Sequence, residues 1–261
     1  MNRALPLLRT AALRLWLPVL LAIVWWYASA GSQNIYFPPL STILETFAAD
    51  WLGSRAATDL VPSLGKFVLG FLISAAGGIA LGTWLGLSPA AREAAEPVVQ
   101  FLRSLPPPVL LPIGLLLFGI TGTMNVAIIV MGAIWPTVLN TADGIRSLDG
   151  QVADMSRSYR LTFAQRLFSV ALPNAAPQVF AGLRTTLQLS IILIVVSEMV
   201  AAASGVGYYV LNSQQTFAVA QTWAGTLVLG LIGYLSTLVF LAVEKRVLNW
   251  QHGMRRAAEG A

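Results

Sequence analysis

The stretch FVLGFLISAAGGIALGTWLGL, residues 67–87, contains 21 consecutive residues without a charged side chain. A bilayer hydrocarbon core about 30 Å thick is crossed by about 20 apolar residues in an α-helix. Residues 223–243 supply a second uncharged run of the same length. The two runs predict membrane-spanning helices and argue against an ordinary soluble globule.

The composition of the whole chain supports this prediction. Hydrophobic residues make up 56% of the 261 residues and charged residues 10%, too few to cover a soluble surface. A net charge of +5 would suggest a nucleic-acid partner in a soluble protein, but the placement of these charges argues against one. The chain has no cysteine, and its one histidine, His252, lies in a basic tail, so no disulfide framework or metal site is expected.

Four further stretches complete a predicted all-α, polytopic bundle of six transmembrane helices within one domain. Residues 15–30 follow three arginines, and residues 181–203 contain one acid, Glu198. Residues 109–121 and 124–139 are shorter and could form either two short crossings or a re-entrant hairpin. We predict two short helices.

The basic residues predict the orientation of the bundle. With an N-terminus inside the cell and six helices, only Arg55 and Lys66 lie on the outer side. The other fourteen lie on or near the cytoplasmic side: Arg3, Arg9, Arg14, Arg92, Arg103, Arg146, Arg157, Arg160, Arg166, Arg184, Lys245, Arg246, Arg255 and Arg256. This bias follows the positive-inside rule and predicts that both termini are cytoplasmic.

The first predicted helix has a competing interpretation. Basic residues followed by an apolar run and by Ala28–Ala30 also resemble a signal peptide with its cleavage site. The aromatic run Trp25–Tyr27, however, is typical of a membrane interface. We therefore predict that this helix is retained as a span.

Small residues recur every fourth position in the second predicted span. They are Gly70, Ser74, Gly78, Gly82 and Gly86. This spacing places them on one helix face, where another helix can approach closely. The pattern predicts a packing seam and no chemistry.

Residues 141–178 form a long predicted cytoplasmic segment. Apolar side chains such as Leu161 and Phe163 are interleaved with charged ones, which predicts an amphipathic helix broken near residues 160–162. Such an element could lie on the membrane or dock into the groove of a partner, and the residues themselves leave both possibilities open.

The run DMSRSYR, residues 154–160, is followed after twelve residues by Pro173. This spacing resembles the E-A-A-x-x-x-G…L-P cytoplasmic loop of binding-protein-dependent ABC transporter permeases. Further matches in the same order extend the resemblance over about residues 35–210, and they lie at 63–65, 70–71, 140–149, 182–184, 198–202 and 205–208. The pattern is most similar to the branch that imports nitrate, taurine and alkanesulfonates.

The resemblance implies an all-α permease in the bacterial inner membrane. A second permease copy, most simply in a homodimer, two ABC ATPase subunits and a periplasmic binding protein are the expected partners. The loop would form a coupling helix that docks on an ATPase, with contacts from Asp154, Arg157, Ser158, Arg160, Leu161, Phe163, Leu172 and Pro173. The chain has no G-x-x-x-x-G-K-[ST] motif, so we expect ATP and Mg²⁺ on the partner ATPase and no cofactor or enzymatic activity on this chain.

Four residues of the loop depart from the family pattern. Asp154 stands in place of glutamate, Met155 and Ser156 in place of two alanines, and Arg160 in place of glycine. An arginine adopts a positive φ less easily than glycine. The turn is therefore expected to be either right-handed or strained.

Glu198, Met199 and Arg184 are the candidates for a translocation pathway or gate. An acid within a span is costly and faces the bundle interior, a partner or water. At 1.5 Å per residue Glu198 lies about 6 Å below the outer end of its helix, so water is expected to reach it. A gating or structural role is favoured, while substrate contact or proton relay stays open. Arg184 could attract an anion or extend to the headgroups.

Two other classes of membrane protein predict different features. An ion-gradient-driven secondary transporter or channel predicts several buried ionisable residues near the midplane, and an intramembrane enzyme predicts a catalytic constellation. The sequence shows neither pattern. It predicts the permease subunit of an ATP-driven importer of a small anionic solute, with sulfonates, nitrate, taurine, aromatic acids and pyrimidine-type precursors all open as substrates.

Overall fold

The computed structural model describes residues 4–250, with side chains from residue 16 onward. Arg3, His252, Arg255 and Arg256 lie outside these residues. The described chain is helical and contains no strand. Its α-helices are α1 (Ala4–Ser29), α2 (Leu40–Trp51), α3 (Val61–Leu87), α4 (Pro89–Ser104), α5 (Leu111–Phe118), α6 (Gly122–Arg146), α7 (Gly150–Ser158), α8 (Phe163–Arg166), α9 (Leu172–Ala201), α10 (Val206–Gln215) and α11 (Val219–Val247). Short π-helical or 3₁₀ turns η1 (Ala56–Leu60), η2 (Pro107–Leu110) and η3 (Leu167–Ala171) join some of them.

Among the described residues, four helices are long and apolar enough to cross a membrane. They are η1 with α3, then α6, the continuous helix Phe163–Ala201, and α11. A fifth span is reached if the bent pair α4 and α5 counts as one. The apolar part of α1, Trp16–Ser29, is shorter.

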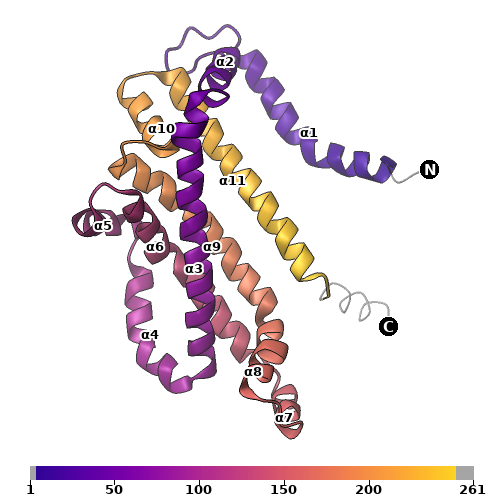
Figure 1. Cartoon of the computed structure of the whole chain (residues 1–261). Coiled ribbons are helices and arrows are strands. Elements are labelled where there is room, and N and C mark those ends of the chain that lie inside the picture. The colour runs from indigo at the N-terminus through magenta and orange to yellow at the C-terminus, as the bar shows by residue number, and fades with distance from the viewer. Residues whose placement is uncertain (1–3, 251–261) are drawn as a thin grey trace.

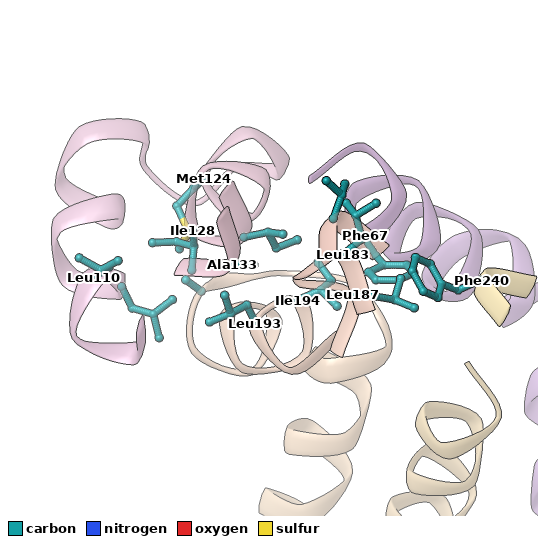
Figure 2. Packing of buried hydrophobic residues seen from close by; sticks show 14 of the residues in the cluster. Phe67, Leu110, Met124, Ile128, Ala133, Leu183, Leu187, Leu193, Ile194 and Phe240 are labelled. Atoms are coloured by element: carbon teal, nitrogen blue, oxygen red, sulfur yellow. The ribbon is translucent and has the colours of Figure 1, made fainter. Parts of the chain in front are cut away.

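The core lies where α3, α6 and α9 pack side by side (Figure 1). Met124, Ile128 and Ala133 of α6 face Leu193 and Ile194 of α9, as Figure 2 shows. Phe67 of α3 and Phe240 of α11 close the cluster at its other side. The three helices thereby bury the main apolar cluster, and α4, α5 and α10 are arranged around it.

The small residues of α3 form the expected packing seam against α6. A Cβ atom added at Gly70, Gly78, Gly82 or Gly86 would lie between 2.5 Å and 2.8 Å from the nearest atom of α6. Ser74 in the same row is fully buried, and its hydroxyl donates to the Gly70 carbonyl. Larger side chains along this row would separate the two helices.

The region between α3 and α6 differs from the two short helices predicted there. Residues 124–139 belong to the longer helix α6, which continues to Arg146. Residues 109–121 contain only an eight-residue helix, α5, which is too short to cross a bilayer. The helix before it, α4, was not predicted because its charged residues interrupt the apolar pattern, and it meets the η2–α5 segment at an angle of 93°.

The predicted cytoplasmic segment 141–178 is also more helical than expected. Its first residues complete α6, and everything from Phe163 onward is continuous with α9. Only the short helix α7 and its flanking turns project from the bundle, at the end opposite to α2 and α10 (Figure 1).

Candidate functional site

Helix α7 is closed at both ends by local hydrogen bonds. The Asp149 carboxylate accepts from the Gln151 amide at 2.7 Å and caps the first turn. At the other end the amide of Leu161 donates to the Ser156 carbonyl, and the amide of Arg160 donates to that of Arg157. This pair of bonds is the Schellman motif, which ends a helix with one left-handed residue.

Arg160 is that left-handed residue, with φ of +53°. The sequence left open whether the turn would be right-handed or strained, and the structure shows the left-handed geometry that glycine adopts more easily. The turn is therefore kept by its hydrogen bonds although a residue with a Cβ occupies it.

A second helix begins immediately after this turn. The Thr162 hydroxyl accepts from the Gln165 amide, and the Gln165 side chain accepts from the Thr162 amide, which together form a capping box. The predicted break near residues 160–162 is confirmed, since it lies between the Schellman turn of α7 and this cap.

The side chains of this loop divide into an exposed group and a packed group. Phe163 and Tyr159 are 63% and 74% exposed, and Asp154 and Arg157 form an exposed ion pair of 3.2 Å. Ser158 and Arg160 are exposed as well. Leu161, Leu172 and Pro173 are half-buried, and Leu172 packs against the core. The structure therefore brings together most of the predicted contact residues at the tip, whereas Leu172 and Pro173 begin α9.

Glu198 lies near the outer end of α9, as expected, but it is 1% exposed rather than open to water. Its carboxylate accepts hydrogen bonds from the Ser63 hydroxyl at 2.7 Å and 2.8 Å, from the Lys66 amine at 2.5 Å and from the Gly207 amide at 3.1 Å. Ser63 and Lys66 belong to α3 and Gly207 to α10. The acid is therefore satisfied within the fold, which supports the structural role over substrate contact.

Water is excluded because the start of α10 folds over Glu198. Gly205 has φ of +120°, and a Cβ there would lie 2.5 Å from the Glu198 carboxyl carbon. The Gly205 amide donates to Asp59 at 2.8 Å, and the Val206 amide donates to the Ser63 hydroxyl at 3.0 Å. This outer cluster of Asp59, Ser63, Lys66 and Glu198 holds α3, α9 and α10 together.

Sequence reasoning identified Glu198 but missed its partner, Lys66. One signal was present in the chain. Lys66 is one of only two basic residues that the predicted topology places outside, and it begins an apolar run. Opposite charges at the outer ends of two apolar stretches are consistent with an ion pair between adjacent helices.

A second outer contact joins α2 to α10. The Tyr209 hydroxyl donates to Asp50, and the Arg55 guanidinium lies 4.9 Å from the Tyr209 ring centroid. Burial, followed by the hydrogen bond to Asp50, raises the pKa of Tyr209 well above its ordinary value. Tyr209 therefore remains a protonated donor at neutral pH.

Arg184 is held by a partner and does not extend freely to the lipid headgroups, and it lies far from Glu198. Its guanidinium forms an ion pair of 2.6 Å with Glu244 of α11, a partner that the sequence did not reveal. Arg184 and Glu198 are fourteen positions apart in α9, a distance of about 21 Å along the helix. Met199 is half-buried and next to Glu198. The three pathway candidates therefore do not form one site.

Comparisons with known proteins agree with this architecture. A family model described as "Binding-protein-dependent transport system inner membrane component" matches residues 78–249. The putative aliphatic sulfonates transport permease protein SsuC of Bacillus subtilis is 29% identical over 82% of this chain and 78% of its own length. The nitrate import permease protein NrtB of Synechococcus elongatus is 31% identical over 74% of this chain and 73% of its own length.

Two further similarities cover most of the chain. The taurine transport system permease protein TauC of Escherichia coli is 29% identical over 95% of this chain and 92% of its own length. A structure of the MetNI methionine ABC transporter in an inward-facing conformation matches with a TM-score of 0.62 and 18% identity, over 72% of this chain and 94% of that chain. At this low identity the structural match supports the fold alone.

These findings favour an ABC permease over the alternative of an ion-gradient-driven secondary transporter or channel. The resemblance predicted from the sequence is confirmed by the family model and by the relatives. The chain belongs to the binding-protein-dependent transport system inner membrane components, and it is a multi-pass permease subunit of an ABC importer.

Proposed function

We propose that two copies of this chain enclose a pathway for a small anion, that two ABC ATPase subunits bind at the α7 end, and that a periplasmic binding protein delivers the solute at the α2 and α10 end. ATP and Mg²⁺ bind the ATPases only. The N- and C-termini face the cytoplasm, which is supported by the excess of basic residues on that side of the predicted topology.

The observation that carries this proposal is the shape of the α7 loop. A rigid helix, closed by the Asp149 cap and by the Arg160 turn, presents exposed apolar side chains beyond the end of the bundle. Met155, Tyr159 and Phe163 are each more than half exposed. Apolar side chains beside exposed charges are suited to a groove in a soluble partner.

Mechanically, the loop is able to transmit movement because it continues directly into the bundle. The helix that begins at Phe163 continues without interruption to Ala201, beside the outer cluster around Glu198. A displacement of α7 by ATP-driven closure of the ATPases therefore acts on the long helix as a lever. Asp154, Arg157, Ser158 and Arg160 supply the polar contacts, and Leu161 and Phe163 supply the apolar ones.

The solute is proposed to be an oxyanion. The relatives transport, by their names, aliphatic sulfonates, nitrate and taurine, and a bicarbonate transport permease of Synechococcus elongatus is 31% identical over 82% of this chain. Each of these four solutes is an oxyanion or carries an oxyanion group.

The test is co-purification of the chain with its ATPase subunit and measurement of ATPase activity. Leu161→Asp with Phe163→Asp should abolish the complex, and Met155→Asp with Tyr159→Asp should do the same without altering a half-buried residue. Ile35→Asp is the matched control, because Ile35 is 74% exposed at the opposite end. A complex that survives both double variants, with the permease folded by size-exclusion chromatography, would place the ATPase surface elsewhere.

A further inference from the structure

Helix α4 carries a row of polar side chains along one face. Arg92, Glu96, Gln100 and Arg103 follow one another at spacings of four, four and three residues, so they share a stripe. The neighbouring face packs on α6 through Ala91, Ala95 and Val99.

The stripe borders a groove between α4 and α6. This groove has a volume of about 360 Å³ and begins among charged groups at the inner ends of both helices. Its lining residues are Leu85, Arg92, Glu96, Val99, Gln100, Leu139, Ala142, Asp143 and Arg146. Gln100 is the polar residue that reaches farthest along α4 within it, and Arg103 lies one turn beyond.

Contacts of the next segment fix the depth of Arg103. Pro107, which follows the 93° bend, packs so closely on α6 that a Cβ at Gly132 would lie 2.9 Å from it and 2.7 Å from Leu193 of α9. Gly132 is near the middle of α6, and Leu193 is eight residues from the outer end of α9. Arg103 itself stands about 21 Å along α4 from Pro89. It therefore lies at about mid-height along the bundle, on its surface, and not at the cytoplasmic end that the sequence predicted.

Such a position is costly if it faces lipid. A charged side chain within the bilayer faces a bundle interior or water, and a broken backbone at that depth is tolerated only inside protein or along a water-filled cavity. Arg103 is exposed on this chain and forms no ion pair among residues 16–250. Its Nε donates to the Gln100 amide oxygen at 2.8 Å, and its two terminal nitrogens make no hydrogen bond among residues 16–250.

We infer that Gln100 and Arg103 form an oxyanion-binding station at the end of this groove, and that the groove is water-filled and belongs to the inner half of the translocation pathway. The guanidinium offers two parallel N–H donors to two oxygens of a nitrate, sulfonate or carboxylate group. The Gln100 side chain orients the guanidinium through Nε. This inference rests on the proposed transport of an oxyanion and assigns that solute a place on the chain.

Because the chain contains no cysteine, introduced thiols test the groove directly. Ser104→Cys places a reporter one turn beyond Gln100 and next to Arg103 in the chain, and Val98→Cys places a control on the other, apolar side of α4, where Val98 is 58% exposed. In inside-out vesicles, a membrane-impermeant methanethiosulfonate reagent should modify the thiol at position 104 at least tenfold faster than the thiol at position 98. Equal rates, or a faster reaction at position 98, would overturn the water-filled groove.

The charge of Arg103 is tested by the sign of the reagent. An anionic sulfonatoethyl reagent and a cationic trimethylammonium reagent are compared on the Ser104→Cys variant. Arg103→Gln should lower the anionic-to-cationic rate ratio by about tenfold, since a unit charge about 6 Å away in water changes each rate by about threefold in opposite directions. Arg103→Lys should keep the ratio, and Lys245→Gln, which removes an exposed charge on α11, should leave it unchanged. An anionic-to-cationic rate ratio that is the same with and without Arg103→Gln would overturn the inference.

Two further arms separate the possible anions. If an anionic lipid headgroup bound Arg103, the thiol at position 104 would be protected from the reagent in vesicles that contain anionic lipid and would react in purely zwitterionic vesicles. That result would show that Arg103 is not a binding station for the solute.

Uptake of nitrate and methanesulfonate is then measured in proteoliposomes with the ATPase and the binding protein, and Arg103→Gln should reduce this uptake at least tenfold. If the wild type takes up either anion but the labelling results differ from those expected, the binding station at Arg103 is refuted while the proposed solute stands. Successful labelling without uptake of either anion would refute the proposed solute while the groove stands.

Discussion

The amine of Lys66 lies 2.5 Å from a carboxylate oxygen of Glu198, although 132 residues separate the two in the chain. Lys66 is 17% exposed and Glu198 1%, so neither charge is well solvated. The attraction between two buried charges offsets the loss of their hydration only when both are present. Each therefore depends on the other to remain in place.

Glu198→Ala should lower the free energy of unfolding by about 3–5 kcal/mol, because it leaves a largely buried lysine and the Gly207 amide without their acceptor. Thermal unfolding in detergent measures the loss. Asp154→Ala is the control, since its pair with Arg157 is exposed and should contribute less than about 1 kcal/mol. Glu198→Leu combined with Lys66→Met should recover part of the stability, and a double variant as unstable as the sum of the singles would contradict the pairing.

Arg160→Gly should stabilise the chain by about 0.5–1 kcal/mol. The φ of +53° at this position is unfavourable for a residue with a Cβ, and that cost is larger than the entropy that glycine loses on folding. Tyr159→Gly is the matched control at φ of −75°, where glycine brings only the entropic cost and should destabilise. Equal effects of the two glycines on the melting temperature would show that the turn is not strained.

Tyr209→Phe tests the outer contact through its pH dependence. The folded-state pKa of Tyr209 is raised above its unfolded value, so the protonated phenol stabilises the fold fully below about pH 10 and less as the pH rises above it. The stability difference between wild type and variant should be about 1 kcal/mol at neutral pH and should shrink above pH 10.

Tyr208→Phe provides the comparison for this measurement, because the Tyr208 hydroxyl makes no hydrogen bond within residues 16–250. It should leave the stability at neutral pH unchanged. A constant difference between wild type and Tyr209→Phe from pH 7 to pH 11 would mean that the Asp50 contact is absent in solution.

The sequence predicted those features that repeat along one helix. The row from Gly70 to Gly86 indicated a seam because a period of four marks one helix face, and the broken amphipathic pattern near Arg160 indicated a turn. It did not reveal that Arg184 pairs with Glu244, since 60 residues separate them and only the packing of α9 against α11 brings them together. Hydrophobic windows missed α4 because its polar stripe lowers the average that such windows measure.

The packing seam between α3 and α6 can be tested by comparing two glycines that both lie within apolar helices but differ in how closely a neighbouring helix approaches them. A Cβ at Gly82 would lie 2.5 Å from the Val138 carbonyl oxygen and 2.6 Å from the Thr141 Cβ, whereas a Cβ at Gly233 of α11 would meet no atom within 4 Å. Gly82→Ala should therefore destabilise by about 1–3 kcal/mol, because the α6 backbone must move away. Gly233→Ala should be neutral or stabilising, since alanine favours the helix. If both variants melted at the wild-type temperature, α3 and α6 would not be in contact at this level, and the core built on that contact would be wrong.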